Sequence, residues 1–170
     1  MAEGAPEFDP YAVMQALDGQ GVSYIVVGGF ARILQGTEEL TRGIDIVPST
    51  RSENLDRLTA ALNDLGARRA DRRELDLRTS VEREEPVIEL TTRHGQVRVV
   101  PQPAGTRGFD DLRKAATRQP LGRGTSPFVA SVGDLARMSS ALEGEEHLSE
   151  VRQLRRLAEL ERSRTRSIER

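Results

Sequence analysis

The most constraining feature of the sequence is a pair of short apolar runs that flank two adjacent glycines. Tyr24–Val27 is mostly apolar and ends at Gly28 and Gly29, and the second run, Ile44–Val47, ends at Pro48. Short apolar runs bounded by glycine or proline are typical of buried strands. Two glycines after a strand allow close approach of a ligand and leave backbone amides at a helix start. The segment therefore predicts a strand–helix–strand unit with a candidate anion site at the glycines.

Local patterns elsewhere predict further elements. Asp9 before Pro10 is typical of a helix start, and Ser52 and Ser131 are candidate caps of two more helices. Gly66 is placed to end the helix that begins at Ser52. Helices are predicted at 10–18, 30–35, 52–65, 109–117, 131–142 and 145–162. Strands are predicted at 24–27, 44–47, 75–79, 87–92, 96–100 and 127–130, with a hairpin turn at His94-Gly95.

This order of elements predicts an α/β (α+β) fold, in which a mixed sheet is flanked by helices. We expect residues 1–130 to form the α/β domain and residues 131–170 to form C-terminal helices packed on it. The chain ends in an Arg-rich tail, Arg152–Arg170, which could contact RNA or an acidic partner. The alternative is a solvated helix end that frays.

Composition excludes several classes of function. The chain has 170 residues, no Cys and two His, which excludes disulfides, Cys-based zinc sites, thiol catalysis and a multi-histidine metal centre. No run approaches the roughly 18 apolar residues that cross a bilayer, and the N-terminus lacks a signal-peptide layout. We therefore expect a cytoplasmic protein with no membrane contact. The net charge of -2 makes no overall electrostatic case for nucleic acid.

Asp45 is the conspicuous polar residue of the second apolar run. Ile44 and Ile46 point to one face of the predicted strand, and Asp45 points to the other face with Gly43 and Val47. A carboxylate in a short buried strand is costly unless it is paired, bound to a metal or placed at a cleft mouth. A structural ion pair and a metal ligand are both open interpretations.

The segments Val26–Ala31 and Thr41–Val47 resemble the nucleotidyltransferase superfamily of the polymerase-β type. They look most like its small bacterial branch, the minimal and toxin-type nucleotidyltransferases of the AbiEii and MenT kind. The resemblance implies a nucleotidyltransferase-like fold in which Gly28 and Gly29 form the loop under the triphosphate. It also implies that Gln96–Val100 is a later strand that bears a third carboxylate.

The chemistry of that family depends on closely spaced carboxylates. The resemblance implies that the segment from Thr41 to Asp45 is the strand that normally reads Thr-x-Asp-x-Asp. Two such aspartates share a strand face, and a third from a neighbouring strand completes a cage for Mg²⁺ ions. The ions clamp the attacking and leaving oxygens during transfer from a nucleoside triphosphate.

This sequence departs from the family pattern at five positions. Gly43 stands where the first aspartate is expected, and Arg98 stands where the third carboxylate is expected. The other three departures are Glu39 in place of a basic residue, Ser139 in place of a helix lysine, and Gln35 in place of a histidine. The retained scaffold with altered chemistry predicts a degraded catalytic site.

Asp45 is the one acidic position of this set that remains. If the strands pair as the resemblance implies, the Arg98 guanidinium reaches Asp45 and forms an ion pair about where a metal ion would sit. One carboxylate is a poor Mg²⁺ site, so the metal role of Asp45 is expected to be lost. With deep burial, removing Asp45 alone would cost on the order of 3 kcal/mol.

Two functional hypotheses follow from the resemblance and the departures. The first is a catalytically impaired or inactive relative of toxin–antitoxin nucleotidyltransferases, which binds a protein partner or a nucleotide and needs no cofactor. The backbone at Gly28 and Gly29 could still bind phosphate or could form a tight turn alone. The alternative is an active enzyme that uses Mg²⁺ and transfers a nucleoside monophosphate from NTP to RNA, protein or a small molecule. It needs a further carboxylate, and Glu89 and Asp76 are the candidates.

Overall fold

The computed structural model describes residues 6–142 and 145–168, and in the last helix it describes the side chains of residues 151–164. The helices are α1 (Pro10–Gly19), α2 (Gly28–Gln35), α3 (Ser52–Asp64), α4 (Leu77–Glu82), α5 (Phe109–Arg113), α6 (Val132–Ala141) and α7 (Glu145–Ile168). The strands are β1 (Tyr24–Val27), β2 (Gly43–Pro48), β3 (Arg68–Arg69), β4 (Ile88–Thr92), β5 (Gly95–Val99), β6 (Thr117–Arg118) and β7 (Phe128–Val129).

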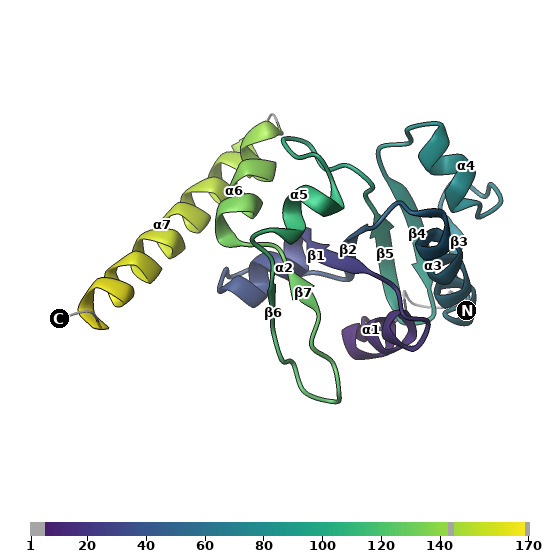
Figure 1. Ribbon diagram of the computed structural model, residues 1–170, viewed down its shortest axis with the longest axis horizontal. Coiled ribbons are helices and arrows are strands. Elements are labelled where there is room, and N and C mark those ends of the chain that lie inside the picture. The colour runs from purple at the N-terminus through teal and green to yellow at the C-terminus, as the bar shows by residue number, and fades with distance from the viewer. Residues whose placement is uncertain (1–5, 143–144, 169–170) are drawn as a thin grey trace, which may run out of the picture.

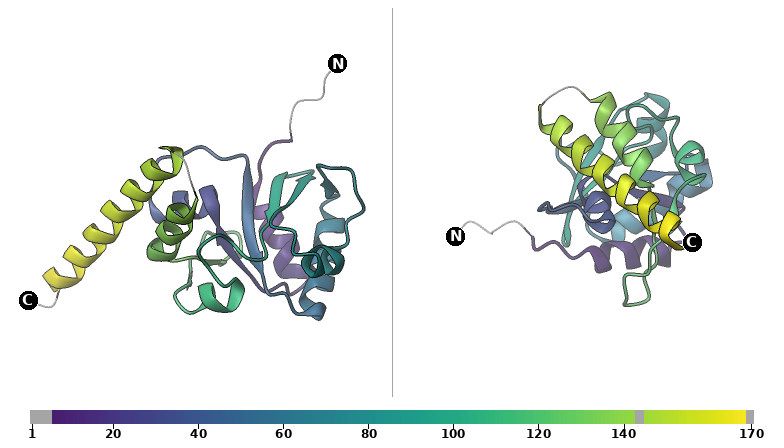
Figure 2. Two further views of the ribbon diagram at one scale, coloured as in Figure 1. Left: turned by 90° about the horizontal axis from the view of Figure 1, so that it is seen from above. Right: turned by 90° about the vertical axis from the view of Figure 1, so that its left-hand side faces the viewer.

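The strands form one mixed sheet in the order β3-β4-β5-β2-β1-β7-β6. β2 lies antiparallel to β1 and parallel to β5, and β1 lies parallel to β7. Helices α3 and α5 lie on one face of the sheet, α2 lies on the other face, and α6 and α7 lie at one end (Figures 1 and 2). The mixed sheet flanked by helices confirms the predicted fold class.

The two faces of the β4–β5 hairpin differ in burial. In both strands buried and exposed residues alternate, as expected for a sheet covered on one side. The buried set is Ile88, Leu90, Val97 and Val99. The exposed set is Glu89, Thr91, Gln96 and Arg98. The exposed set lies on the α2 side of the sheet, because Arg98 pairs in register with Asp45, which lies against the start of α2. This half of the sheet face is open to solvent.

Several local predictions are confirmed. The Asp9 side chain accepts a hydrogen bond from the amide of Ala12 and caps α1, and Ser131 does the same for α6 through the amide of Asp134. α2 ends at Gln35 as predicted, and the next residue, Gly36, adopts a left-handed conformation with φ of 114° that favours glycine. The hairpin around His94-Gly95 forms in the predicted place.

Three local predictions are wrong. The cap position of α3 is Arg51 rather than Ser52, and it makes no side-chain capping hydrogen bond. The exposed strand predicted near 75–79 is instead the start of α4, because Asp76 accepts a hydrogen bond from the amide of Thr79 and nucleates a helical turn. The helix from Phe109 ends at Arg113, and the residues after it turn to pair β6 with β7.

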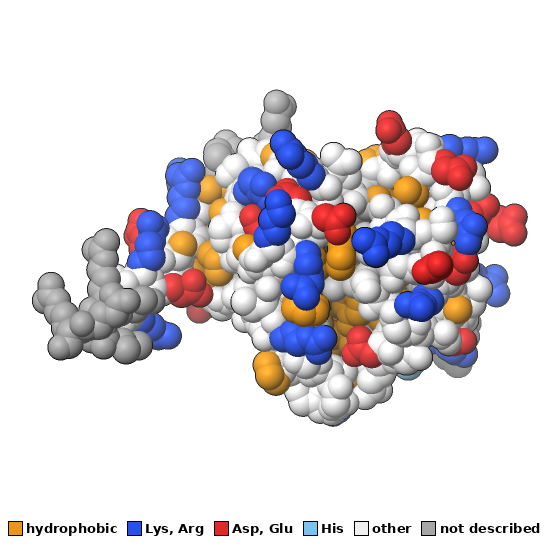
Figure 3. Space-filling model, viewed as in Figure 1, with side chains coloured by type: hydrophobic (Ala, Val, Ile, Leu, Met, Phe, Trp, Pro, Cys, Tyr) orange, Lys and Arg blue, Asp and Glu red, His pale blue; other side chains and the backbone are white. Residues whose placement is uncertain are grey.

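The last two helices pack on one another. Val151 and Leu154 of α7 are buried, while Leu160 is exposed, and the C-terminal part of α7 extends away from the rest of the chain (Figure 1). In the face shown in Figure 3, basic and acidic side chains are interspersed, so this face is not uniformly basic. Among the described residues, no helix has the length and apolar character needed to cross a membrane.

Candidate functional site

The corner between β1 and α2 has no space for a side chain. α2 begins at Gly28, two residues earlier than predicted, directly after the last residue of β1. Gly28 has φ of +70°, and a Cβ there would lie 2.2 Å from Oδ2 of Asp45. Both the backbone conformation and the close approach require glycine. The Asp45 carboxylate therefore lies directly against the predicted nucleotide-binding glycines.

Position 43 is also closed, but by backbone atoms. Gly43 of β2 is in register with Gln96 of the parallel strand β5. A Cβ at position 43 would lie 2.4 Å from the carbonyl oxygen of Gln96 and 2.9 Å from its carbonyl carbon. The Thr41 hydroxyl donates a hydrogen bond to the Gly43 carbonyl oxygen at 2.9 Å and holds the chain at this point. An aspartate at position 43 does not fit without a shift of one strand.

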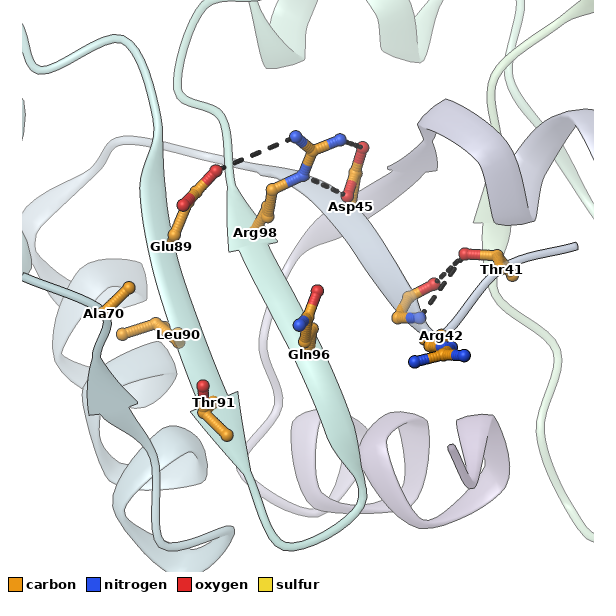
Figure 4. Close-up of a pocket in the computed structure, with 10 residues that line it drawn as sticks. Thr41, Arg42, Asp45, Ala70, Glu89, Leu90, Thr91, Gln96 and Arg98 are labelled. Carbon is orange, nitrogen blue, oxygen red and sulfur yellow. Dashed lines mark hydrogen bonds and ion pairs between the residues drawn. The ribbon is translucent and has the colours of Figure 1, made fainter. Parts of the chain in front are cut away.

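Asp45 and Arg98 form the ion pair that the sequence predicts. Nε of Arg98 donates to Oδ1 of Asp45 at 3.0 Å, and Nη2 donates to Oδ2 at 2.9 Å, so the guanidinium engages both carboxylate oxygens (Figure 4). The hydrogen bond to Asp45 raises the pKa of Arg98. The side chains are 17% and 49% exposed for Asp45 and Arg98 respectively. The pair is shallower than the deep burial considered from the sequence, so a loss near 3 kcal/mol on removing Asp45 is not expected.

A second ion pair lies beside Gly29. Arg32 of α2 donates to both carboxylate oxygens of Glu39 at distances of 2.9–3.1 Å, and Thr37 donates to Glu39 at 2.5 Å. Burial raises the pKa of Glu39, but the hydrogen bonds from Arg32 and Thr37 outweigh it and hold the pKa below its usual value. A Cβ at Gly29 would lie 3.9 Å from Oε1 of Glu39. In the sequence, Glu39 stands out only as a departure from the family pattern, because its pairing with Arg32 depends on how the loop after α2 folds back.

The remaining predicted site residues are Ser139, Gln35, Glu89 and Asp76. Ser139 is buried on α6 and lines the cavity next to the glycines, and Gln35 donates to the Ala130 carbonyl at 2.9 Å. Glu89 faces the same side as Arg98, with 3.9 Å between Oε1 and Nη1. Asp76 is not brought to the site, because its carboxylate caps α4 through Thr79.

Two cavities open beside the Asp45–Arg98 pair. A small one of about 210 Å³ lies over the open half-sheet between β2, β4 and β5 (Figure 4). A larger one of about 450 Å³ lies between the β1–α2 corner, the loop after β5 and helix α6. The larger cavity contains the two glycines, both members of the ion pair and mostly apolar side chains, so we regard it as the candidate ligand site.

The residues present do not fit a Mg²⁺ centre. Within the described residues, no group of three or more acidic or His side chains is arranged to hold a metal ion. Both oxygens of Asp45 accept hydrogen bonds from Arg98, and the neighbouring Glu89 faces the same guanidinium. A cation cannot act as a ligand, and Mg²⁺ needs several oxygen ligands in near-octahedral geometry.

The fold is similar to those of several solved proteins, among them an antibiotic adenylyltransferase and an antibiotic-resistance factor. One is the crystal structure of the lincosamide antibiotic adenylyltransferase LnuA with lincomycin bound, with a TM-score of 0.59, 16% identity, and coverage of 89% of this chain and 99% of that chain. The other is the solution structure of the antibiotic-resistance factor ANT(2'')-Ia, with a TM-score of 0.53, 16% identity, and coverage of 94% and 92%. The chain matches no protein-family model and no curated protein. The similarity confirms the nucleotidyltransferase type of fold.

Proposed function

We propose that this chain is a nucleotidyltransferase-fold protein that has lost metal-dependent catalysis and acts by binding. The observation that carries the proposal is the bidentate contact between Arg98 and Asp45. A guanidinium stands where the resemblance implies a metal ion, and it satisfies the one acidic position that remains. Nucleotidyl transfer by two Mg²⁺ ions needs carboxylates that this site does not offer.

The backbone at Gly43 supports the same proposal. If only the side chain were missing at position 43, one substitution would restore the carboxylate. The Gln96 carbonyl instead occupies the space of the missing side chain, so the two strands are closer than an aspartate permits. The obstacle to a carboxylate at position 43 therefore includes the backbone as well as the side chains.

The ligand we propose is a small molecule or nucleotide held in the 450 Å³ cavity, with a protein partner of a toxin–antitoxin type of module as the wider setting. The cavity includes Gly28 and Gly29 at the start of α2, where the resemblance implies the nucleotide-binding loop. The likeness to LnuA, which has lincomycin bound, supports a small-molecule site on this fold. The AbiEii/MenT relationship, the RNA role of the Arg-rich tail and the cytoplasmic location remain predictions.

The test is calorimetric titration of the purified protein with ATP, GTP, CTP and UTP, with and without Mg²⁺. We expect no binding that depends on Mg²⁺, and no incorporation of a labelled nucleotide into protein or RNA. Tight Mg²⁺-dependent binding of one nucleotide that Asp45→Asn abolishes would overturn the proposal. That outcome would favour the active transferase, with Glu89 as the additional carboxylate after movement of Arg98.

A further inference from the structure

The candidate cavity has an apolar wall and an apolar rim. Its wall includes Val27, Val100, Leu135 and Met138, which come from β1, the residue after β5 and helix α6. Its rim includes Val87 and Leu142, which are 37% and 47% exposed. Large apolar side chains that stay exposed around a hollow mark binding sites more often than isolated ones do. Among the described residues, two of the four exposed large hydrophobic side chains are at this cavity.

The charged groups at the cavity are already neutralised by this chain. Its two cations are Arg98, which engages both oxygens of Asp45, and Arg32, which engages both oxygens of Glu39. A third carboxylate, Glu89, lies 3.9 Å from Arg98. Each cation that lines the cavity is therefore already paired with a carboxylate of this chain before any ligand arrives.

The start of α2 also lies close to carboxylates of the chain itself. Asp45 fills the space beside Gly28, whereas a Cβ at Gly29 would lie 3.6 Å from Nη2 of Arg32 and 3.9 Å from Oε1 of Glu39. The positive end of a helix favours a negative charge, and here Asp45 supplies one. A triphosphate would have to displace these carboxylates or lie against them. No Mg²⁺ site is present in the described residues to offset the repulsion.

We infer that this cavity takes an uncharged, largely apolar small molecule in preference to a nucleoside triphosphate. The inference rests on the proposed function, because it concerns the ligand of the same non-catalytic site. A volume of about 450 Å³ lies within the range of small-molecule sites, and such sites combine an apolar lining with a few fixed polar groups. The Asp45–Arg98 pair supplies those polar groups at the edge of the apolar wall.

The experiment uses Nile red, an uncharged dye whose emission shifts to the blue in an apolar site, and ATP as the anionic competitor. We expect saturable micromolar binding of Nile red that ATP does not displace, with or without Mg²⁺. Val87→Gln and Leu142→Gln each remove an exposed apolar side chain from the rim. We expect each to weaken dye binding about tenfold, which corresponds to about 1.4 kcal/mol.

Leu40→Gln is the matched control, because Leu40 is a fully exposed large apolar side chain that does not line the cavity. It should leave dye binding unchanged. Equal weakening by Leu40→Gln, or none by the two rim variants, would overturn the inference, since the dye would then be bound elsewhere. Displacement of the dye by ATP without Mg²⁺ would also overturn it. ATP binding that requires Mg²⁺ would overturn the proposed function itself.

A gain-of-binding variant tests the electrostatic part of the inference. Asp45→Asn removes the charge that neutralises Arg98 and keeps the shape of the side chain. We expect this variant to bind ATP without Mg²⁺ more tightly than the parent protein does, by at least tenfold. Unchanged ATP affinity in a folded Asp45→Asn protein would show that charge does not set the ligand class.

Discussion

At the residue scale, Gly28 and Gly43 are both closed to side chains, for different reasons. Gly28 has a left-handed backbone and faces the flexible carboxylate of Asp45, whereas Gly43 faces the backbone carbonyl of Gln96. A side chain end can rotate away, but a strand carbonyl cannot move without disturbing the ladder to which it belongs. Neighbouring atoms therefore exclude a side chain more strictly at Gly43 than at Gly28.

We predict that Gly43→Ala lowers the free energy of unfolding by about 1–3 kcal/mol, because the new methyl group forces β2 and β5 apart. Gly43→Asp should cost at least as much and should not create Mg²⁺ binding. The measurement is urea unfolding with and without Mg²⁺. Gly133→Ala is the control, since a Cβ at Gly133 meets nothing closer than 3.9 Å and should be neutral or stabilising. A stable Gly43→Asp protein that binds Mg²⁺ would contradict the steric argument.

We also predict that the two halves of the ion pair differ in cost. Asp45→Asn leaves a half-exposed Arg98, which water can solvate, so the loss should be at most about 1 kcal/mol. Arg98→Met leaves a mostly buried carboxylate against Gly28, and this should cost about 1–3 kcal/mol. Urea unfolding of the two variants and of the double variant measures the coupling. The reverse order of costs would show that Asp45 is more solvated than its contacts indicate.

At the element scale, the segment between α3 and β4 is organised by one buried cation. Arg69 of β3 donates to Asp71, to Glu85 and to the hydroxyl of Ser80 on α4, and its side chain is almost fully buried. The cluster joins the edge strand β3 to the short helix α4. The sequence of this segment is rich in Arg and Glu, and no local pattern indicates which Arg is buried.

This cluster predicts acid sensitivity. The hydrogen bond from Arg69 lowers the pKa of Glu85 below its usual value of 4.5 and lowers that of Asp71 as well. A lowered folded-state pKa contributes stability that is present above the unfolded-state pKa and is lost as the pH falls through the folded-state value. We expect the urea midpoint to fall progressively below pH 4.5. Glu85→Gln should lower stability at neutral pH and flatten this dependence, and an unchanged pH profile would exclude Glu85 as a contributor.

At the scale of the whole molecule, helix α6 connects the cavity to the C-terminal helix. One side of α6 lines the cavity through Leu135 and Met138, and α6 packs against α7, in which Leu154 is fully buried. α2 also contacts α6, so the β1–α2 corner, α6 and α7 form a continuous set of packed elements. The position of the cavity wall therefore depends on residues far from Asp45 in the sequence.

We predict that Leu154→Ala lowers the free energy of unfolding by about 2–5 kcal/mol, because it leaves a cavity in the contact between α6 and α7. The same change at Leu160, in the same helix but exposed, should alter stability by less than about 0.5 kcal/mol. Thermal and urea unfolding give both values. Similar effects of the two substitutions would show that α7 does not pack on α6 in solution.

Much of the fold follows from short-range patterns. Caps at Asp9 and Ser131, the apolar run before Gly28 and the hairpin at His94-Gly95 each act over a few residues, so the sequence alone predicts them. The Asp45–Arg98 pair was also predictable from the sequence, because strand alternation and the family resemblance together place both side chains on one face. The prediction for the segment after α3 was wrong, because burial in this segment depends on distant partners rather than on periodicity.

The sequence by itself determined most of the elements, the fold class and the altered chemistry at positions 43 and 98, because residue identity and local spacing specify them. The tertiary structure alone decided how closely β2 and β5 approach at Gly43, the ion pair between Glu39 and Arg32, and the apolar cavity beside α6. These features depend on distances between segments that are remote in the chain. Side-chain charge is visible in a sequence, but whether that charge is already neutralised is settled by packing.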